Sequence, residues 1–138
     1  MFFNKEKNNK HENSYLVKIA ALLVYTAKID EKYSIEEEEI IKKTLLDLGT
    51  NKSDLETILN EAKQKEEDAN QILDFTREIK NLEEKNKIQI IKSLWRIIYS
   101  NKDADIYETN LMRRLSGLLY IDSKTMGDIK EQIKKENS

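Results

Sequence analysis

Apolar residues recur at three- and four-residue spacing along most of the chain, and this pattern predicts an all-α fold. The sequence contains no proline and little of the strict alternation that is typical of strands. Seven helices are expected, over about residues 14–28, 35–48, 54–65, 69–80, 82–99, 106–119 and 124–135. Their apolar stripes predict a core made of Leu16, Ala20, Leu23, Val24, Ala27, Ile41, Leu45, Leu48, Leu55, Ile58, Leu59, Ala62, Ile72, Phe75, Ile79, Ile88, Ile91, Leu94, Trp95, Ile98, Leu111, Leu115, Leu118, Leu119, Met126, Ile129 and Ile133.

Residues 1–12 are polar apart from Phe2 and Phe3, so we expect a flexible N-terminal tail followed by a single helical domain over residues 13–138.

Three of the predicted helix starts carry the same type of cap. Ser34-x-x-Glu37 and Ser53-x-x-Glu56 fit a capping box, in which the Ncap oxygen accepts the N3 amide and the N3 glutamate reaches back. Asp105-x-x-Glu108 places aspartate at the Ncap instead. Gly49 suits the left-handed position that ends a helix.

The second half of the chain repeats the pattern of the first at an offset of 71 residues. Ala20 falls on Ile91, Leu23 on Leu94, Ser34 on Asp105 and Glu37 on Glu108, so core positions and caps share one register. We therefore expect two related helical hairpins, with the remaining helices packed around them.

The amino-acid composition argues against nucleic-acid binding and against most familiar enzyme mechanisms. The chain of 138 residues is 36% charged with a formal net charge of −2, and no Lys/Arg-rich run stands out, which argues against a nucleic-acid partner. There is no cysteine, the single histidine is His11 in the polar N-terminal stretch, and three glycines are too few for a phosphate-binding loop. These absences predict a protein that is not an enzyme.

Hydropathy predicts neither a membrane span nor a secretory signal. The longest apolar run, from Ile19 to Tyr25, is far shorter than the roughly 20 residues that a spanning helix needs. Phe2 and Phe3 are followed at once by polar residues, without the apolar segment of a signal peptide. We expect a cytoplasmic protein, and the lysine-rich, asparagine-rich composition is typical of an AT-rich bacterial genome.

The two turns inside the predicted hairpins form the one constellation with candidate chemistry. Asp30 precedes Glu37 by seven residues in the first turn, and Asn101 precedes Glu108 by seven in the second. Oxygen-only side chains suit hard cations such as Ca²⁺ or Mg²⁺, and these four residues are the predicted metal ligands. Helix capping alone also explains both glutamates, so both interpretations stay open. Tyr99 and Tyr107 lie beside the second turn and are candidate partner-binding residues, whereas Trp95 falls on the core stripe.

These turns resemble those of the TerB-like domain family, which includes the tellurite-resistance protein TerB and the N-terminal domain of the membrane co-chaperone DjlA. The resemblance covers about residues 16–133. It is carried by Ala27, Asp30, Ser34, Glu37 and Ile41 in the first half and by Leu94, Trp95, Tyr107, Glu108, Arg113, Arg114 and Leu118 in the second. It implies a seven-helix fold, a role in stress-response assemblies and acidic residues that hold a metal ion. The chain departs from the family pattern at Glu31 and Lys102, which replace turn glycines, and at Asn101, which replaces the second aspartate.

The favoured prediction is a non-enzymatic TerB-like domain that binds protein partners, with weak divalent-cation binding left open. The alternative is a metal-independent structural or oligomerising helical domain whose acidic turns are only caps. A metal-assisted hydrolase is the least favoured, because it needs more inward-facing acids than the pattern provides. Homo-oligomerisation, and peripheral membrane association through a partner, are left open.

Overall fold

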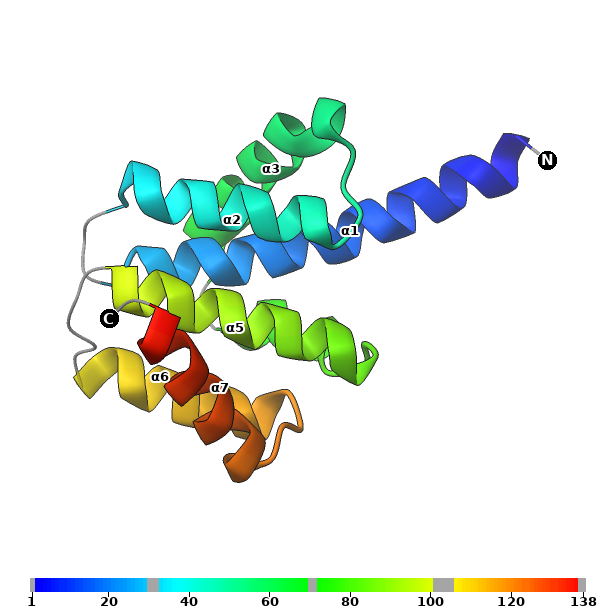
Figure 1. Ribbon diagram of the computed structural model, residues 1–138. Coiled ribbons are helices and arrows are strands. Elements are labelled where there is room, and N and C mark those ends of the chain that lie inside the picture. The colour runs from blue at the N-terminus through cyan, green and yellow to red at the C-terminus, as the bar shows by residue number, and fades with distance from the viewer. Residues whose placement is uncertain (1, 30–32, 70–71, 101–105, 137–138) are drawn as a thin grey trace.

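The computed structural model describes the backbone of residues 2–29, 33–69, 72–100 and 106–136, and side chains from Tyr15 onward with Ile106, Tyr107 and Glu108 left out. Within these residues the chain is helical and contains no strand, so the predicted all-α bundle is confirmed (Figure 1). The helices are α1 Phe2–Ala27, α2 Ile35–Asp47, α3 Leu55–Asp68, α4 Leu73–Ile79, α5 Glu84–Ser100, α6 Ile106–Leu118 and α7 Ser123–Glu136, with a short 3₁₀ helix η1 Lys52–Asp54 before α3.

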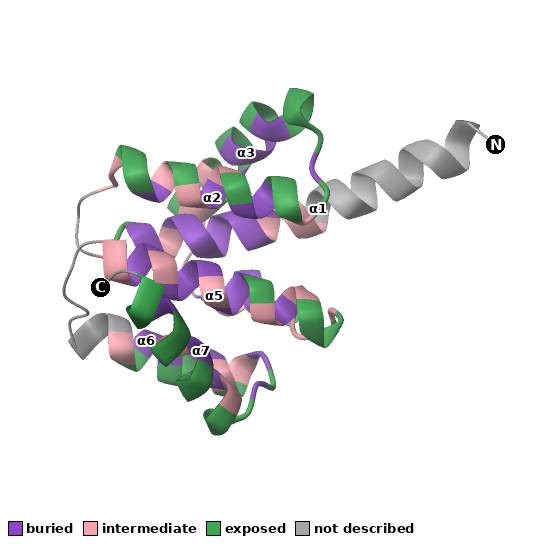
Figure 2. Cartoon of the chain, viewed as in Figure 1, coloured by how far each residue is buried: buried purple, intermediate pink, exposed green. Residues whose placement is uncertain are grey.

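α1 is the central helix. Its second half is buried on nearly every side, because it contacts α2, α3, α4 and α5 (Figure 2). The sequence Ile19 to Val24 is accordingly an unbroken apolar run and not a stripe. The helix begins at Phe2, earlier than the expected start at 14, and its first turns extend past the rest of the bundle in Figure 1. The flexibility of residues 1–12 stays a prediction.

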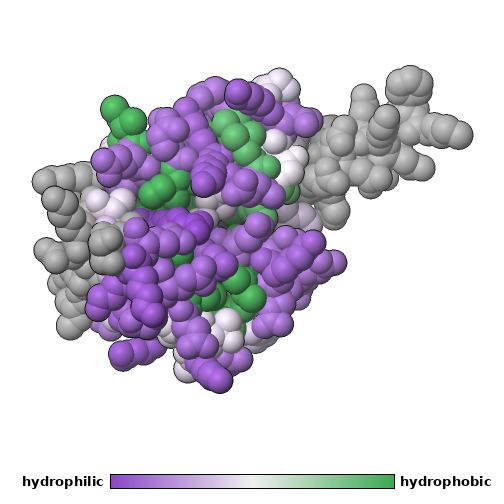
Figure 3. Space-filling model, in the orientation of Figure 1, coloured by the Kyte–Doolittle hydropathy of each residue, from purple (hydrophilic) through white to green (hydrophobic). Residues whose placement is uncertain are grey.

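The predicted core is confirmed at almost every position. Leu23 and Leu94 are fully buried, and Trp95 is only 2% exposed. Leu16, Leu48, Ile88 and Leu118 are instead half-buried at the edge of the core. The face of the molecule in Figure 3 is mostly hydrophilic with small hydrophobic areas, as the high charged fraction requires.

The internal repeat is visible in the helix boundaries and in the backbone hydrogen bonds. Each bound of α6 lies 71 residues after the corresponding bound of α2. α2 ends with a bond from the amide of Thr50 to the carbonyl of Leu45 (3.0 Å), and α6 ends with the equivalent bond from Ile121 to Ser116 (2.9 Å). Gly49 has a φ of 106° at the end of α2, and its counterpart Tyr120 has a φ of 58°. Both helices therefore terminate through a left-handed residue at the equivalent position.

One of the predicted capping boxes forms and one does not. Ser34 caps α2, and both of its reciprocal bonds with Glu37 are present. The expected box at Ser53 is wrong, because η1 occupies Lys52–Asp54 and places Ser53 inside a 3₁₀ turn. Asp122 is a cap that the pattern did not predict: its Oδ1 accepts the amide of Thr125 (2.7 Å) at the start of α7. The predicted cap Asp105 lies outside the described residues.

Candidate functional site

The described helix ends that flank the two hairpin turns lie at one end of the bundle. α1 and α5 run in the same direction, and α2 and α6 run back, so the last turns of the first pair and the first turns of the second lie together (Figure 1). We call this end of the molecule the turn end. Asp30 and Asn101 lie outside the described residues, and the side chains of Glu108 and Tyr107 are not described. Of the four predicted metal ligands, the structure therefore describes only the side chain of Glu37.

Glu37 is buried at the first turn of α2, with an exposed fraction of 1%. Its Oε1 accepts the amide of Ser34 at 2.9 Å, and its own amide donates to Oγ of Ser34 at 3.1 Å. The capping interpretation of this residue is confirmed. A cation that used the same carboxylate would have to share it with the Ser34 amide, and cation binding stays a prediction.

An ionic network connects the start of α2 to α3. Nζ of Lys63 lies 2.8 Å from Oε1 of Glu38, and the hydroxyl of Tyr33 donates to the same oxygen at 3.3 Å. Lys42 pairs with Glu56 at 3.1 Å and lies 3.9 Å from Oε2 of Glu38. The hydrogen bond from Lys63 lowers the pKa of Glu38. Burial, followed by the charge of Glu38, raises the pKa of Tyr33 well above its ordinary value.

The predicted partner residue Tyr99 is half-buried at the C-terminal end of α5. Its ring stacks on Trp95, with centroids 5.8 Å apart and an interplanar angle of 25°. Burial, followed by the charge of Glu131, raises the pKa of its hydroxyl. One face of Tyr99 is thus covered by Trp95, and its role toward a partner stays a prediction.

The structure adds a pocket at the turn end that the sequence did not reveal. It measures about 470 Å³ and lies between α1 and α6, lined by Tyr25, Ile29, Asn110, Leu111 and Arg114. Apolar walls with a few convergent polar groups are typical of binding sites. Arg114 stood in the family signature, but nothing in the spacing indicated that it would face the end of α1, because α2 to α5 separate α1 from α6 in the sequence.

Comparison with known proteins identifies the family. The sequence model of the family described as tellurite resistance protein TerB matches residues 16–131. The chain belongs to the TerB family. The match runs from the buried half of α1 into α7 and therefore includes both hairpins of the repeat. No curated protein and no solved structure matches the chain at a significant level. In the part of the chain that the structure describes, no helix has the length and hydropathy needed to cross a membrane.

Proposed function

We propose that this TerB-family chain is a non-enzymatic binding domain that engages a protein partner at the turn end, within a cytoplasmic stress-response system of the tellurite-resistance type. The observation that carries the proposal is the pocket between α1 and α6. Tyr25, Ile29 and Leu111 offer apolar contact area, and Asn110 and Arg114 add hydrogen-bond donors to it. This combination suits an apolar side chain of a partner next to a backbone carbonyl or carboxylate.

The residues that line this pocket support binding over catalysis. The set contains no carboxylate, histidine or cysteine, which are the commonest general bases and nucleophiles, and Tyr25 is its one side chain with a hydroxyl. Among the described residues no group of three His, Cys, Asp or Glu side chains could hold a metal ion. Phosphoester, ester and peptide substrates should therefore give background turnover, and turnover abolished by Glu37→Gln would overturn the non-enzymatic proposal.

Site-specific photo-crosslinking tests the partner site. A photoreactive residue in place of the exposed Arg114 should give a discrete heterologous adduct in cells, identifiable by mass spectrometry. The same residue in place of Gln132, which is exposed on α7, is the control and should not give that adduct. Asn110→Arg should remove the adduct by filling the pocket. Identical adducts from both positions would contradict a partner site at the turn end.

A second candidate is a metal-independent structural or oligomerising domain. The capping box of Glu37 favours it, since Oε1 of this acid already accepts the amide of Ser34 without a metal. Sedimentation equilibrium in chelator separates the candidates: a stable homo-oligomer, together with self-adducts from position 114, would favour the second candidate over a heterologous partner.

A further inference from the structure

A second pocket lies in the groove between α6 and α7 and shares no lining residue with the pocket at the turn end. It measures about 210 Å³. Trp95 of α5 lines it together with Met112 and Arg113 of α6 and Met126 and Lys130 of α7. We call it the α6–α7 groove. Because α6 and α7 repeat α2 and α3, the chain contains an internal reference for this groove.

In the first repeat the equivalent cation is neutralised. Lys42, the counterpart of Arg113, pairs with Glu56 at 3.1 Å and lies 3.9 Å from Glu38. At the same offset of 71 residues, Glu38 corresponds to Thr109 and Glu56 to Gly127. Thr109 and Gly127 both line the α6–α7 groove. The second repeat has thus kept the cation and lost both carboxylates that pair with its counterpart.

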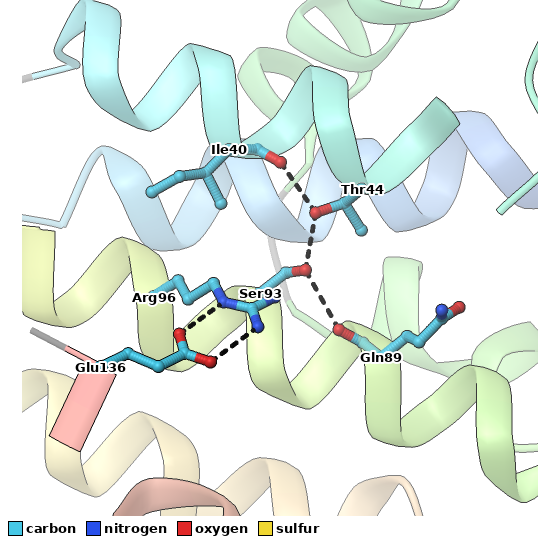
Figure 4. Close-up of polar contacts among 6 residues, drawn as sticks. All are labelled: Ile40, Thr44, Gln89, Ser93, Arg96 and Glu136. Atoms are coloured by element: carbon cyan, nitrogen blue, oxygen red, sulfur yellow. Dashed lines mark hydrogen bonds and ion pairs between the residues drawn. The ribbon is translucent and has the colours of Figure 1, made fainter. Parts of the chain in front are cut away.

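The second repeat also gains a cation. Lys130 stands where the first repeat has the buried Leu59, and its Nζ lies 5.4 Å from the centroid of the Trp95 ring. Of the acids of α7, neither Asp128 nor Glu131 lines the groove. Glu136 pairs with Arg96 at 3.2 Å instead (Figure 4). Two positive charges therefore share a groove whose described lining contains no carboxylate.

Trp95, which lines the groove, also carries an unsatisfied donor. Its Nε1 is buried and has no hydrogen-bond acceptor among the described residues. A buried N–H without an acceptor costs free energy, and a ligand oxygen that reached this atom would reduce that cost. The two methionines provide adaptable apolar walls, which are common at peptide-binding surfaces.

We propose that the α6–α7 groove binds an acidic peptide segment, with a carboxylate between Arg113 and Lys130 and an apolar side chain against Met112 and Met126. The ligand carboxylate takes the place that Glu38 and Glu56 hold beside Lys42 in the first repeat. The groove is open beside Gly127, where an added Cβ would meet nothing within 4 Å. This site is separate from the pocket at the turn end and does not depend on it.

Intrinsic fluorescence reports on this groove directly, because Trp95 is the only tryptophan of the chain. The probe is the peptide acetyl-Glu-Leu-Glu-amide, titrated at constant ionic strength, and the matched control peptide is acetyl-Gln-Leu-Gln-amide. We expect a saturable change of the emission with the acidic peptide and at least about tenfold weaker binding of the amide peptide. Equal responses to the two peptides would overturn the proposal, as would a response to inorganic phosphate alone.

Variants tie the response to the named cations. Arg113→Gln and Lys130→Gln should each weaken binding about tenfold or more, since each removes a charge-assisted contact. Lys134→Gln removes an exposed charge of α7 that lines neither of the two pockets, and binding should be unchanged. The pair Thr109→Glu with Gly127→Glu restores the carboxylates of the first repeat and should abolish binding. Undiminished binding by both folded single variants would contradict the assignment.

Discussion

Single buried leucines on α1 and α5 stabilise the centre of this molecule. Leu94 is fully buried, and its counterpart Leu23 in the first repeat is buried to the same extent. Leu94→Ala should lower the free energy of unfolding by about 2–5 kcal/mol, through lost transfer energy and a residual cavity. Urea unfolding measures this loss. Leu46→Ala is the control, because Leu46 is 39% exposed and its loss should stay below about 1 kcal/mol. Equal losses at positions 46 and 94 would contradict the core assignment.

Two glycines should respond in opposite directions to the same substitution. Gly117 lies inside α6, so Gly117→Ala should raise the free energy of unfolding by about 0.5–1 kcal/mol. Gly49 has a φ of 106°, where an L side chain is strained, so Gly49→Ala should lower the free energy of unfolding by about 1 kcal/mol. A Cβ at either position would meet nothing within 4 Å, so backbone conformation alone decides the sign. Thermal unfolding measures both changes. Stability changes of the same sign in the two variants would contradict this reasoning.

At the scale of single helices, the start of α2 differs from the start of α3. Ser34 accepts the Glu37 amide, whereas Ser53 lies within η1 and caps nothing at the start of α3. Ser34→Ala should therefore lower the free energy of unfolding by about 1 kcal/mol. Ser53→Ala is the matched control and should change it by less than about 0.5 kcal/mol. Chemical denaturation of both variants measures the difference, and a larger loss at Ser53 would mean that η1 is not the start of this segment.

The contact between α2 and α5 contains a buried hydroxyl pair (Figure 4). Oγ1 of Thr44 lies 2.6 Å from Oγ of Ser93, and the two hydroxyls also lie 2.7 Å from the carbonyl of Ile40 and 3.0 Å from that of Gln89, respectively. Three oxygen–oxygen contacts at hydrogen-bond distance thus share two hydroxyl protons. Removing one hydroxyl leaves the other without its cross-helix partner, whereas removing both leaves no such group.

A double-mutant cycle tests this coupling. Thr44→Val and Ser93→Ala should each lower the free energy of unfolding by about 1 kcal/mol, and the double variant should lose less than the sum by about 0.5 kcal/mol or more. Thr26→Val with Ser93→Ala is the control pair, because the hydroxyl of Thr26 donates to the carbonyl of Leu22 on its own helix. This control pair should be additive. Additivity in the Thr44–Ser93 cycle would mean that the cross-helix bond contributes nothing.

For the whole molecule, the described helix ends that flank the two hairpin turns lie at the same end of the bundle. Glu37 already uses its carboxylate as a cap, and Asn101 supplies a neutral amide where the family pattern has an aspartate. We therefore expect thermal melts in chelator and in about 5 mM Ca²⁺ or Mg²⁺ to superimpose. Glu108→Gln should have the same small effect in both conditions. A melting temperature raised by cation, and no longer raised in Glu108→Gln, would establish the metal site instead.

The sequence by itself determined the helices, the core and the repeat. On α2 and α7 the apolar residues at helical spacing share one face, so the spacing identifies Leu45 and Ile133 as core residues. On α1 the opposite face is buried as well, and that burial depends on the helices packed around α1. The cap at Ser34 followed from local chemistry, because its donor lies three residues away. The predicted cap at Ser53 is wrong, because residues 52–54 fit both a capping box and a 3₁₀ turn. The relative stability of these two local structures depends on the packing of α3.

Tertiary structure alone decided which helix faces meet. The pocket between Tyr25 and Arg114 joins residues that are far apart in the sequence, and no local spacing encodes that contact. The α6–α7 groove required the same information. Thr109 and Gly127 line it in place of carboxylates, and this difference is recognised only from the ion pairs that Glu38 and Glu56 make with Lys42 in the first repeat. Helix formation depends on neighbours a few residues away, whereas binding sites depend on charges and cavities that only the packing of helices brings together.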